Sequence, residues 1–308
     1  MDRNGADQHQ FVWPDGYRAA VALTFDVDAE AVVLNVNEAY GRRPSVMTHQ
    51  QYGPVTGVPR LLRILADRNV RATFLIPGFT AERHPAMVAA VQEAGHEIGH
   101  HGYLHEQLKG VAEPEERAFM ERGLEALQRV AGVRPTGYRA PWRDTTERTL
   151  DLVAAYGFAY DGSLFDRDVP YRVATGSGPI VEICVSWALD DWEKYAFLPD
   201  PPMGSGVIER PSTVLQTWWE EIQAYEQFGG CCVLTMHPFL SGRPARALAL
   251  AELIDRLLTR PAIWVTTLGE IAAHTARLEG PVERLSLPAP GRDTTPAAPV
   301  GAPRGGKT

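Results

Sequence analysis

The sequence has few cysteines, no long apolar run and no excess of basic residues, and each of these absences excludes a class of function. The cysteines, Cys184, Cys231 and Cys232, are odd in number and lack metal-ligand spacing, which favours reduced core residues. No run approaches the ~18 consecutive apolar residues of a membrane span. With 30 basic against 38 acidic residues, the chain has no electrostatic footprint for nucleic acid or an anionic membrane.

A secretory signal is also missing from the expected place. The first residues are polar and charged, where such a signal needs an apolar core of about 7–15 residues. We therefore expect a cytoplasmic protein that acts on a small or neutral substrate. A length of 308 residues with 44% hydrophobic residues suits one large domain or two small ones.

Apolar, β-rich runs alternate with amphipathic stretches along most of the chain, a pattern typical of a parallel α/β architecture. The predicted strands are residues 19–27, 72–77, 96–101, 136–140, 158–162, 181–187, 231–237 and 263–267. The predicted helices are one that Thr56 would cap and residues 84–94, 115–130, 146–156, 212–228, 245–259 and 268–278. Units of this kind, about seven to eight in number, suit a distorted (β/α) barrel with its chemistry at the C-terminal strand ends.

Composition divides the chain into an N-terminal segment over 1–18, the barrel over 19–278 and a tail over 279–308. The tail is rich in Pro, Gly, Ala and Thr, so we expect it to bury little and to be disordered. Connections in compact domains are commonly about 4–6 residues. The much longer connections at 29–55 and 188–211 are therefore expected to cover or border the site.

Histidines cluster in one short region, which favours a metal site. Four of the nine histidines, His96, His100, His101 and His105, lie within ten positions. His96, Glu97 and His100 match the His-Glu-x-x-His motif of zinc proteases, which requires a continuous helix. Glycines interrupt this stretch, and each costs about 1 kcal/mol relative to alanine in a helix interior. A strand that ends near His101 is the favoured interpretation.

In that interpretation, His101 and His105 lie one turn apart at the start of the next element. A carboxylate from another strand end would complete three metal ligands and leave one position open for water. Asp28 follows an alternating apolar run, and side chains two residues apart on a strand point the same way. Asp26 and Asp28 should therefore face one site together. Solvated strand-end acids are the alternative.

Other polar side chains stand where predicted strands end. Arg139 is followed by Pro141 and by Trp142, and His237 leaves an apolar run that ends in a turn. The run from Trp187 to Trp192 places two acids between tryptophans. Each of these features also has a simpler interpretation. Arg139 would be a surface arginine, His237 a hydrogen-bonded structural histidine, and residues 187–192 a transition from core to loop.

Together these segments resemble the polysaccharide deacetylase family, which includes chitin and peptidoglycan deacetylases. The family's Thr-Phe-Asp-Asp motif appears in spaced form at Thr24 to Asp28, and its His-x-x-x-His motif matches His101 to His105. Its Arg-x-Pro-aromatic motif matches Arg139 to Trp142, and its late histidine motif matches Leu234 to His237. The resemblance covers roughly residues 19–275, with the motifs in the same order.

This resemblance implies a distorted (β/α) barrel that hydrolyses a non-peptide carbon–nitrogen bond with zinc or another divalent metal. Asp28, His101 and His105 would be the metal ligands. Asp26 would be the general base that takes a proton from the attacking water, and His237 the general acid that protonates the departing nitrogen.

The remaining matched residues would support this chemistry. Arg139 resembles the family residue that pairs with the base carboxylate and keeps it ionised. Trp142 would supply a pocket wall and a backbone N–H for the oxyanion. Trp192 is a predicted substrate-binding residue, and so is Asp191, which would orient His237, although the sequence does not distinguish it from Asp190.

The chain departs from the common family pattern in ways that concern the substrate. Val27 separates the two aspartates, and Gly102 replaces the usual Ser or Thr after the first histidine. Residues 187–192 and 237–246 resemble a subgroup that contains cyclic-imide hydrolases and allantoinase-like enzymes together with proteins labelled peptidoglycan deacetylases. The substrate is therefore either a small cyclic amide, imide or ureide, which we favour, or an N-acetylated sugar.

A catalytically inactive scaffold or carbohydrate-binding protein on the same barrel is the alternative of a different class. An inactive copy would have no reason to keep ligands, base and acid together, so the enzyme is favoured. The expected partner is a small-molecule or sugar substrate, with neither nucleic acid nor membrane. Whether the chain forms a homo-oligomer is left open.

Overall fold

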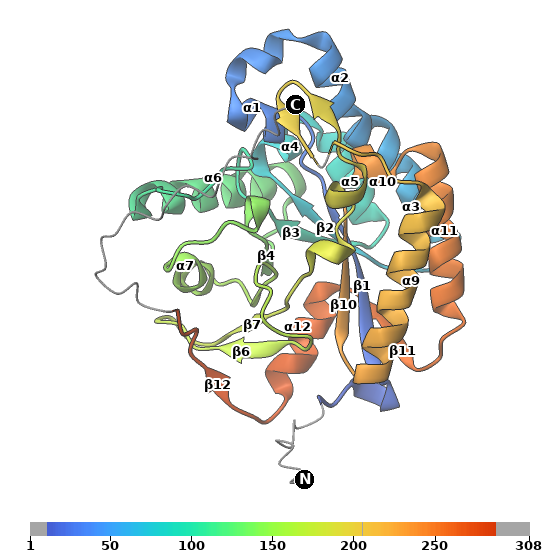
Figure 1. Cartoon of the computed structure of the whole chain (residues 1–308). Coiled ribbons are helices and arrows are strands. Elements are labelled where there is room, and N and C mark those ends of the chain that lie inside the picture. The colour runs from blue at the N-terminus through green and yellow to red at the C-terminus, as the bar shows by residue number, and fades with distance from the viewer. Residues whose placement is uncertain (1–10, 205, 288–308) are drawn as a thin grey trace, which may run out of the picture.

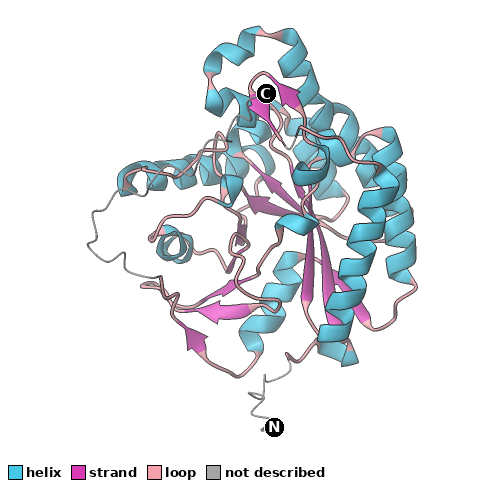
Figure 2. Ribbon diagram, viewed as in Figure 1, coloured by secondary structure: helices cyan, strands magenta, loops and turns pink. Residues whose placement is uncertain are grey.

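The computed structural model describes residues 11–204 and 206–287, and the statements below concern these residues. Within them, a sheet of ten strands curls into an open barrel with helices around it (Figures 1 and 2). This architecture confirms the predicted α/β class and distorted barrel. The strands of the sheet are β1 (Ala19–Asp26), β2 (Thr73–Ile76), β3 (Glu97–His100), β4 (Gly137–Tyr138), β5 (Tyr160–Asp161), β6 (Tyr171–Val173), β7 (Ile180–Glu182), β10 (Cys231–Met236), β11 (Ile263–Thr266) and β12 (Val282–Glu283).

The strand order places the C-terminal ends of β10, β1, β2, β3 and β4 side by side. The order across the sheet is β10-β1-β2-β3-β4-β5-β7-β6-β12, and β11 also pairs with β1. Neighbouring strands run parallel except β6 and β7, which are antiparallel. Parallel strands end at the same edge of the sheet, so the residues that follow them share one side of the barrel.

The helices cover the outside of the sheet and the side of the barrel above the strand ends. Helices α9 and α11 run next to each other along the strands β1 and β10 (Figure 1). The α-helices are α1 (Ala31–Val36), α2 (Pro44–Tyr52), α3 (Val58–Ala66), α4 (Gly78–Arg83), α5 (Pro85–Glu93), α6 (Glu113–Ala131), α7 (Thr149–Ala155), α8 (Trp192–Tyr195), α9 (Pro211–Phe228), α10 (Pro238–Ser241), α11 (Pro244–Leu258) and α12 (Leu268–Arg277). Among the described residues, no helix is both long and apolar enough to cross a membrane.

Strand β1 forms the centre of the fold because both of its edges and both of its faces are covered. Every residue of Ala19–Asp26 is buried. One edge pairs with β10, and the other pairs with β11 over the first half of the strand and with β2 over the second half. A strand that is buried on both faces requires a nearly continuous apolar sequence, and this strand has one.

Residues 29–55, which the sequence predicts to be a long loop, are largely helical. They contain α1, a 3₁₀ helix at Glu38–Arg42 and α2, and a π-helical turn at Gly53–Gly57 leads directly into α3. Thr56 therefore lies inside a continuous helical run, and its predicted role as a helix cap is wrong. Close packing explains the turn, because a Cβ atom on Gly57 would lie 2.2 Å from the carbonyl oxygen of Pro238.

The structure also changes the ends of the predicted barrel. Trp13, placed in the N-terminal segment, is buried, and its Nε1 donates to the carbonyl of Gly229 at 2.8 Å. Val282–Glu283, placed in the tail, forms β12 against β6, and neither strand was predicted. Strands this short carry no periodic pattern. The predicted disorder of residues 288–308 falls outside the described residues.

Candidate active site

The predicted metal ligands, base, acid and arginine meet at one side of the barrel. Asp26 is the last residue of β1, and His101, Arg139 and His237 directly follow the pairing segments of β3, β4 and β10. Asp28 lies two residues beyond β1, and all five side chains are buried. The parallel order of these strands therefore assembles residues that lie up to about two hundred positions apart in the sequence.

Asp28, His101 and His105 form a group whose donor atoms could hold one metal ion. His101 Nε2 lies 3.4 Å from Asp28 Oδ1, and His105 Nε2 lies 3.5 Å from Asp28 Oδ2. Asp28 Oδ1 and His101 Nε2 are buried without a hydrogen-bond partner in the described part of the chain. Unpaired buried polar atoms are costly, and a cation would satisfy both. Two imidazoles and a carboxylate also form a donor set that catalytic zinc sites use.

Protonation states favour the same use of these residues. Burial lowers the pKa of His105 to about 4, so its imidazole is neutral and has a lone pair to offer. Burial opposes ionisation of Asp28, but the nearby His105 and His101 more than offset it and lower its pKa to about 2. The Nδ1 atom of His101 lies 2.8 Å from the carbonyl oxygen of Arg139. This contact fixes the ring proton on Nδ1 and leaves Nε2 unprotonated, with a lone pair for a metal ion.

A tight loop brings His105 back to His101, in place of the helical turn that the sequence suggested. His105 has a φ of 59°, in the left-handed region, and helix α6 begins only at Glu113. The carboxylate of Glu106 accepts hydrogen bonds from the backbone N–H groups of Tyr103 at 2.9 Å and Leu104 at 2.7 Å. Glu106 thereby holds the loop closed, a role for which the sequence offered no signal.

The zinc-protease interpretation of His96, Glu97 and His100 is wrong, because these residues lie at strand β3 and not on a helix. His96 Nδ1 accepts from the backbone N–H of Ala72 at 3.2 Å. His100 Nδ1 accepts from the backbone N–H of Gly102 at 3.2 Å, and its Nε2 lies 3.1 Å from the carbonyl of Met120. Both imidazoles are thus structural.

Asp26 is held as a carboxylate by two arginines. Arg139 Nη1 donates to Asp26 Oδ1 at 2.7 Å, and Arg143 Nη1 donates to Asp26 Oδ2 at 3.1 Å. Burial would raise the pKa of Asp26, but these guanidinium groups more than offset burial and hold it well below its usual range. Asp26 Oδ2 also lies 3.8 Å from His101 Nε2, next to the ligand group.

Arg143 was not predicted, and local backbone geometry explains its position. Trp142 and Arg143 have φ values of 58° and 56°, two successive left-handed residues within a 3₁₀ turn at Pro141–Arg143. This turn folds the chain back, so that Arg143 Nη2 also donates to Asp190 Oδ2 at 3.1 Å. Non-glycine residues in this region are rare and often mark functional sites.

His237 is fixed by Asp191, as the sequence suggested for one of the two neighbouring aspartates. His237 Nδ1 lies 2.7 Å from Asp191 Oδ1, and the backbone N–H of His237 donates to both carboxylate oxygens at 3.0 Å. Burial would lower the pKa of His237, but Asp191, together with Asp28 and Asp190, more than offsets this and raises it to about 10. His237 Nε2, which therefore carries a proton, lies 3.5 Å from Asp28 Oδ2.

The second group of acids and histidine, Asp190, Asp191 and His237, also has metal-ligand proximity. Its oxygen atoms are already used: Asp191 accepts from His237 and Ser241, and Asp190 accepts from Arg143 and from the backbone of Trp192. Protein donors thus already satisfy this group. The buried atoms without a hydrogen-bond partner, Asp28 Oδ1 and His101 Nε2, belong to the Asp28 group, which is therefore the better metal site.

A cavity of about 180 Å³ opens onto the ligand group. Trp142 and Trp192, both predicted to bind substrate, line it with their rings tilted at 79° and 5.8 Å apart. The third predicted substrate-binding residue, Asp191, lies behind His237, and Asp190 lines the cavity instead. Both carboxylates lie near His237 Nδ1, at 2.7 Å for Asp191 Oδ1 and 3.7 Å for Asp190 Oδ1, but of the two only Asp190 reaches the cavity.

Both long connections lie near this cavity, as predicted, but they form a structured cap. Val32, Val33, Val46 and Leu198 make one apolar cluster, against which Trp142 and Trp192 pack. Leu198 belongs to a small hairpin of β8 (Leu198–Pro199) and β9 (Pro202–Met203) that stands next to α1 and α2 in Figure 1. Tyr40 and Arg43 join the two connections by binding Asp200.

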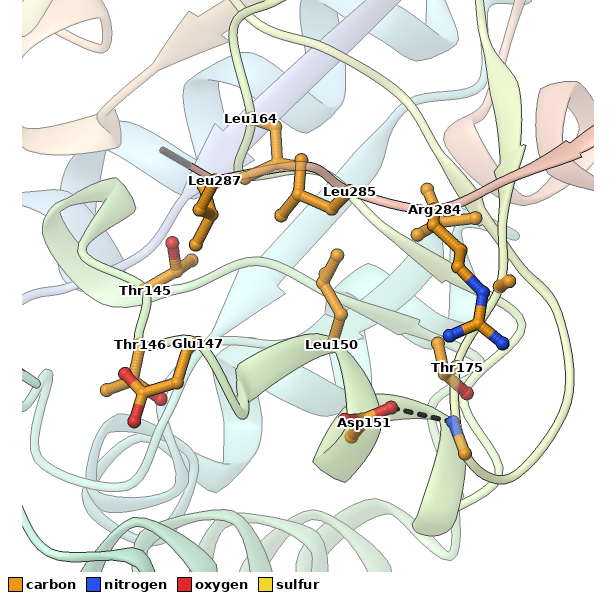
Figure 3. Close-up of a pocket in the computed structure, with 13 residues that line it drawn as sticks. Thr145, Thr146, Glu147, Leu150, Asp151, Leu164, Thr175, Arg284, Leu285 and Leu287 are labelled. Carbon is orange, nitrogen blue, oxygen red and sulfur yellow. Dashed lines mark hydrogen bonds between the residues drawn. The ribbon is translucent and has the colours of Figure 1, made fainter. Parts of the chain in front are cut away.

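A larger cavity of about 470 Å³ lies elsewhere, between α7 and residues 284–287 (Figure 3). Leucines line one part of it and the polar side chains of Asp151, Thr175 and Arg284 another, with Asp151 bonded to the backbone N–H of Gly176. None of the predicted site residues lines it, and its lining includes no histidine. The candidate catalytic cavity is thus the smaller one at the ligand group.

Comparison with known proteins agrees with this geometry. The family described as polysaccharide deacetylase matches residues 15–160. A peptidoglycan deacetylase of Helicobacter pylori is 28% identical over 280 residues, which cover 82% of this chain and 94% of that protein.

Solved structures extend the similarity to nearly the whole chain. A Mycobacterium smegmatis protein assigned to the polysaccharide deacetylases is 49% identical, with a TM-score of 0.89 and coverage of 91% of this chain and 98% of that one. Puue allantoinase shares the fold at 24% identity and a TM-score of 0.74, over 85% of this chain and 91% of its own. The chain therefore belongs to the polysaccharide deacetylase family, hydrolases that act on carbon–nitrogen bonds other than peptide bonds.

Proposed function

We propose that this protein opens a small cyclic amide, imide or ureide by hydrolysis, with zinc as its metal. The observation that carries the proposal is a cavity of about 180 Å³ that reaches Asp28, His105 and His237 and has tryptophans in its wall. Pockets for drug-sized ligands typically measure about 300–1,000 Å³. A five- or six-membered ring fits a smaller space of this kind.

Asp28, His101 and His105 would hold the metal, which when bound would acidify a water molecule and polarise the scissile carbonyl. The two imidazoles and the carboxylate support zinc over magnesium or calcium, which prefer oxygen ligands. We also propose that the protein acts in the cytoplasm.

Asp26 and His237 divide the proton transfers between them. Asp26 accepts the proton of the attacking water, because Arg139 and Arg143 keep it ionised. His237 donates its Nε2 proton to the departing nitrogen, because Asp191 keeps the imidazole protonated. An amide nitrogen leaves poorly without a proton, so the reaction needs both residues. In a cyclic substrate the carboxylate stays on one product molecule with the nitrogen group that forms, which is an amine from an amide, a carboxamide from an imide and a ureido group from a ureide.

N-acetylated sugars are the second candidate substrate. The relatives named above as polysaccharide or peptidoglycan deacetylases support it. The same base and acid would then release acetate from an N-acetyl group. The cap built by α1, α2 and the β8–β9 hairpin favours the compact ring, because a polymer needs a groove that is open at both ends.

The experiment compares the two classes with one enzyme preparation. Purified protein loaded with Zn²⁺ is assayed against succinimide, hydantoin and allantoin, and against N-acetylglucosamine oligomers and peptidoglycan fragments. Ring opening that disappears in an Asp26→Asn variant supports the proposal. Acetate release from the sugars without opening of any ring would replace it with deacetylation.

A further inference from the structure

Two large aromatic side chains stand exposed at the edge of the catalytic cavity. Trp187 is 47% exposed and Phe165 is 43% exposed, although large apolar side chains are normally buried. Their rings stack with centroids 5.0 Å apart and planes 27° from parallel. Trp187 also lines the catalytic cavity, together with Trp142 and Trp192. The stacked pair therefore extends the aromatic wall of the cavity out to the surface.

The backbone holds both residues of the pair in place. The N–H of Val185 donates to the carbonyl of Leu164 at 2.9 Å, which couples the two segments just before each aromatic residue. Trp187 opens a 3₁₀ turn, Trp187–Leu189, for which Ser186 is the cap. The carbonyl of Ala188 accepts from Trp218 Nε1 at 3.2 Å. The exposure of the pair is thus a feature of an anchored structure and not of a loose loop.

We propose that Phe165 and Trp187 bind a flat, apolar substituent on the ring that the enzyme hydrolyses. The proposal rests on the function proposed above and narrows its substrate class to cyclic imides or ureides that carry an aryl group. The catalytic cavity, about 180 Å³, accommodates the ring that is hydrolysed. A substituent on that ring therefore has to project out of the opening of the cavity. Trp187 lines the cavity and is also exposed at the surface, so an aryl group that projects from the cavity beside Trp187 contacts the stacked pair.

The charges around the cavity add a second element of selectivity. Asp28, Asp190 and Glu193 line the cavity, against Arg143 and the two histidines His105 and His237. Arg143 is already bound to Asp26 and Asp190. An anionic substituent would meet Glu193 and Asp190, whereas Arg143 is held by Asp26 and Asp190 and His237 by Asp191, so a neutral aryl group is favoured over a carboxylate.

The test compares hydantoin with 5-phenylhydantoin in wild-type protein and in the variants Phe165→Ala, Trp187→Ala and Trp187→Leu. An aromatic pair contributes about 0.5–1.5 kcal/mol beyond its buried area, which converts to about a 2- to 13-fold effect. We expect the ratio of kcat/KM for 5-phenylhydantoin to that for hydantoin to fall by this factor in each variant. Trp187→Leu keeps apolar bulk without a ring, so it separates stacking from mere contact.

Phe228→Ala is the matched control, because Phe228 is 80% exposed at the end of α9, next to the start of β10 and not at the strand ends. This control should keep the wild-type ratio. Ring opening with an unchanged ratio in the Phe165 and Trp187 variants would overturn the substituent site alone. The absence of any ring opening in wild type would overturn the proposed function and this site with it. If the Phe165 and Trp187 variants lost activity only on N-acetylated sugars, the pair would be assigned to sugar stacking. That result would also refute the proposal.

Discussion

Replacing Asp26 with asparagine removes the proposed base while keeping its size and shape. An amide cannot accept the proton of the attacking water, and general-base catalysis typically contributes about 10²–10⁴-fold. At about 1.36 kcal/mol for each factor of ten, the barrier should rise by about 2.7–5.4 kcal/mol. Because Asp26 is not one of the three proposed ligands, Asp26→Asn should keep its metal.

The same change leaves two buried guanidinium groups without their shared counter-charge. Arg139 is fully buried, and its Nη1 lies 2.7 Å from Asp26 Oδ1. Removing one partner of a buried ion pair typically costs about 3–5 kcal/mol, and each kcal/mol lowers Tm by about 2–4 °C in domains of about 150–250 residues. We therefore expect a Tm lowered by about 6–20 °C, so activity has to be measured well below the new midpoint.

The assay combines turnover at saturating substrate, metal content and thermal unfolding on the same sample. Asp255→Asn is the matched control, since Asp255 is an exposed carboxylate paired with Arg68 on the protein surface. It should change neither turnover nor metal content. Turnover of Asp26→Asn within about tenfold of wild type, with metal bound, would refute the assignment of the base, because it falls below the usual range for general-base catalysis.

Two further predictions concern buried carboxyl groups. Asp191→Asn should lower kcat more than it changes KM and should move the alkaline limb of the pH–rate profile to lower pH, because Asp191 leads the carboxylates that outweigh burial and raise the pKa of His237 to about 10; an unmoved limb would contradict this positioning role. Burial and the neighbouring Asp161 raise the pKa of Glu182 well above its ordinary value of 4.5, so the folded state keeps a proton there. The free energy of unfolding should then fall as the pH rises above the ordinary pKa of 4.5, because the unfolded chain loses this proton first. Glu182→Gln should flatten this fall, and urea titrations between about pH 5 and pH 8 would detect the difference.

Long apolar runs made the central strands predictable from the sequence. The strand expected at 19–27 is Ala19–Asp26, and the strand expected at 231–237 is Cys231–Met236. Both are buried on two faces, so burial dictates their composition directly. The polar residues that follow these strands lie together for the same reason, since a polar side chain at the end of a buried parallel strand has few other places to lie.

Tertiary packing decided what the sequence did not predict. Arg143 reaches Asp26 only because two successive residues adopt left-handed backbone conformations, which no composition pattern encodes. The strand expected at 136–140 pairs only over Gly137–Tyr138, where the chain turns towards Pro141. Residues 29–55 form helices whose apolar side chains pack against the hairpin, so their structure depends on a segment more than a hundred residues away.

Metal content of single histidine variants tests the central claim most directly. His101→Ala and His105→Ala remove proposed ligands that follow β3, whereas His96→Ala removes a buried imidazole that precedes β3 and accepts from the backbone N–H of Ala72. Each protein is loaded with Zn²⁺, desalted and analysed for bound metal, with thermal unfolding as the check of folding. We predict that the ligand variants lose the metal while His96→Ala retains it. Retention by folded His105→Ala with loss from folded His96→Ala would contradict the metal site on which the proposed function depends.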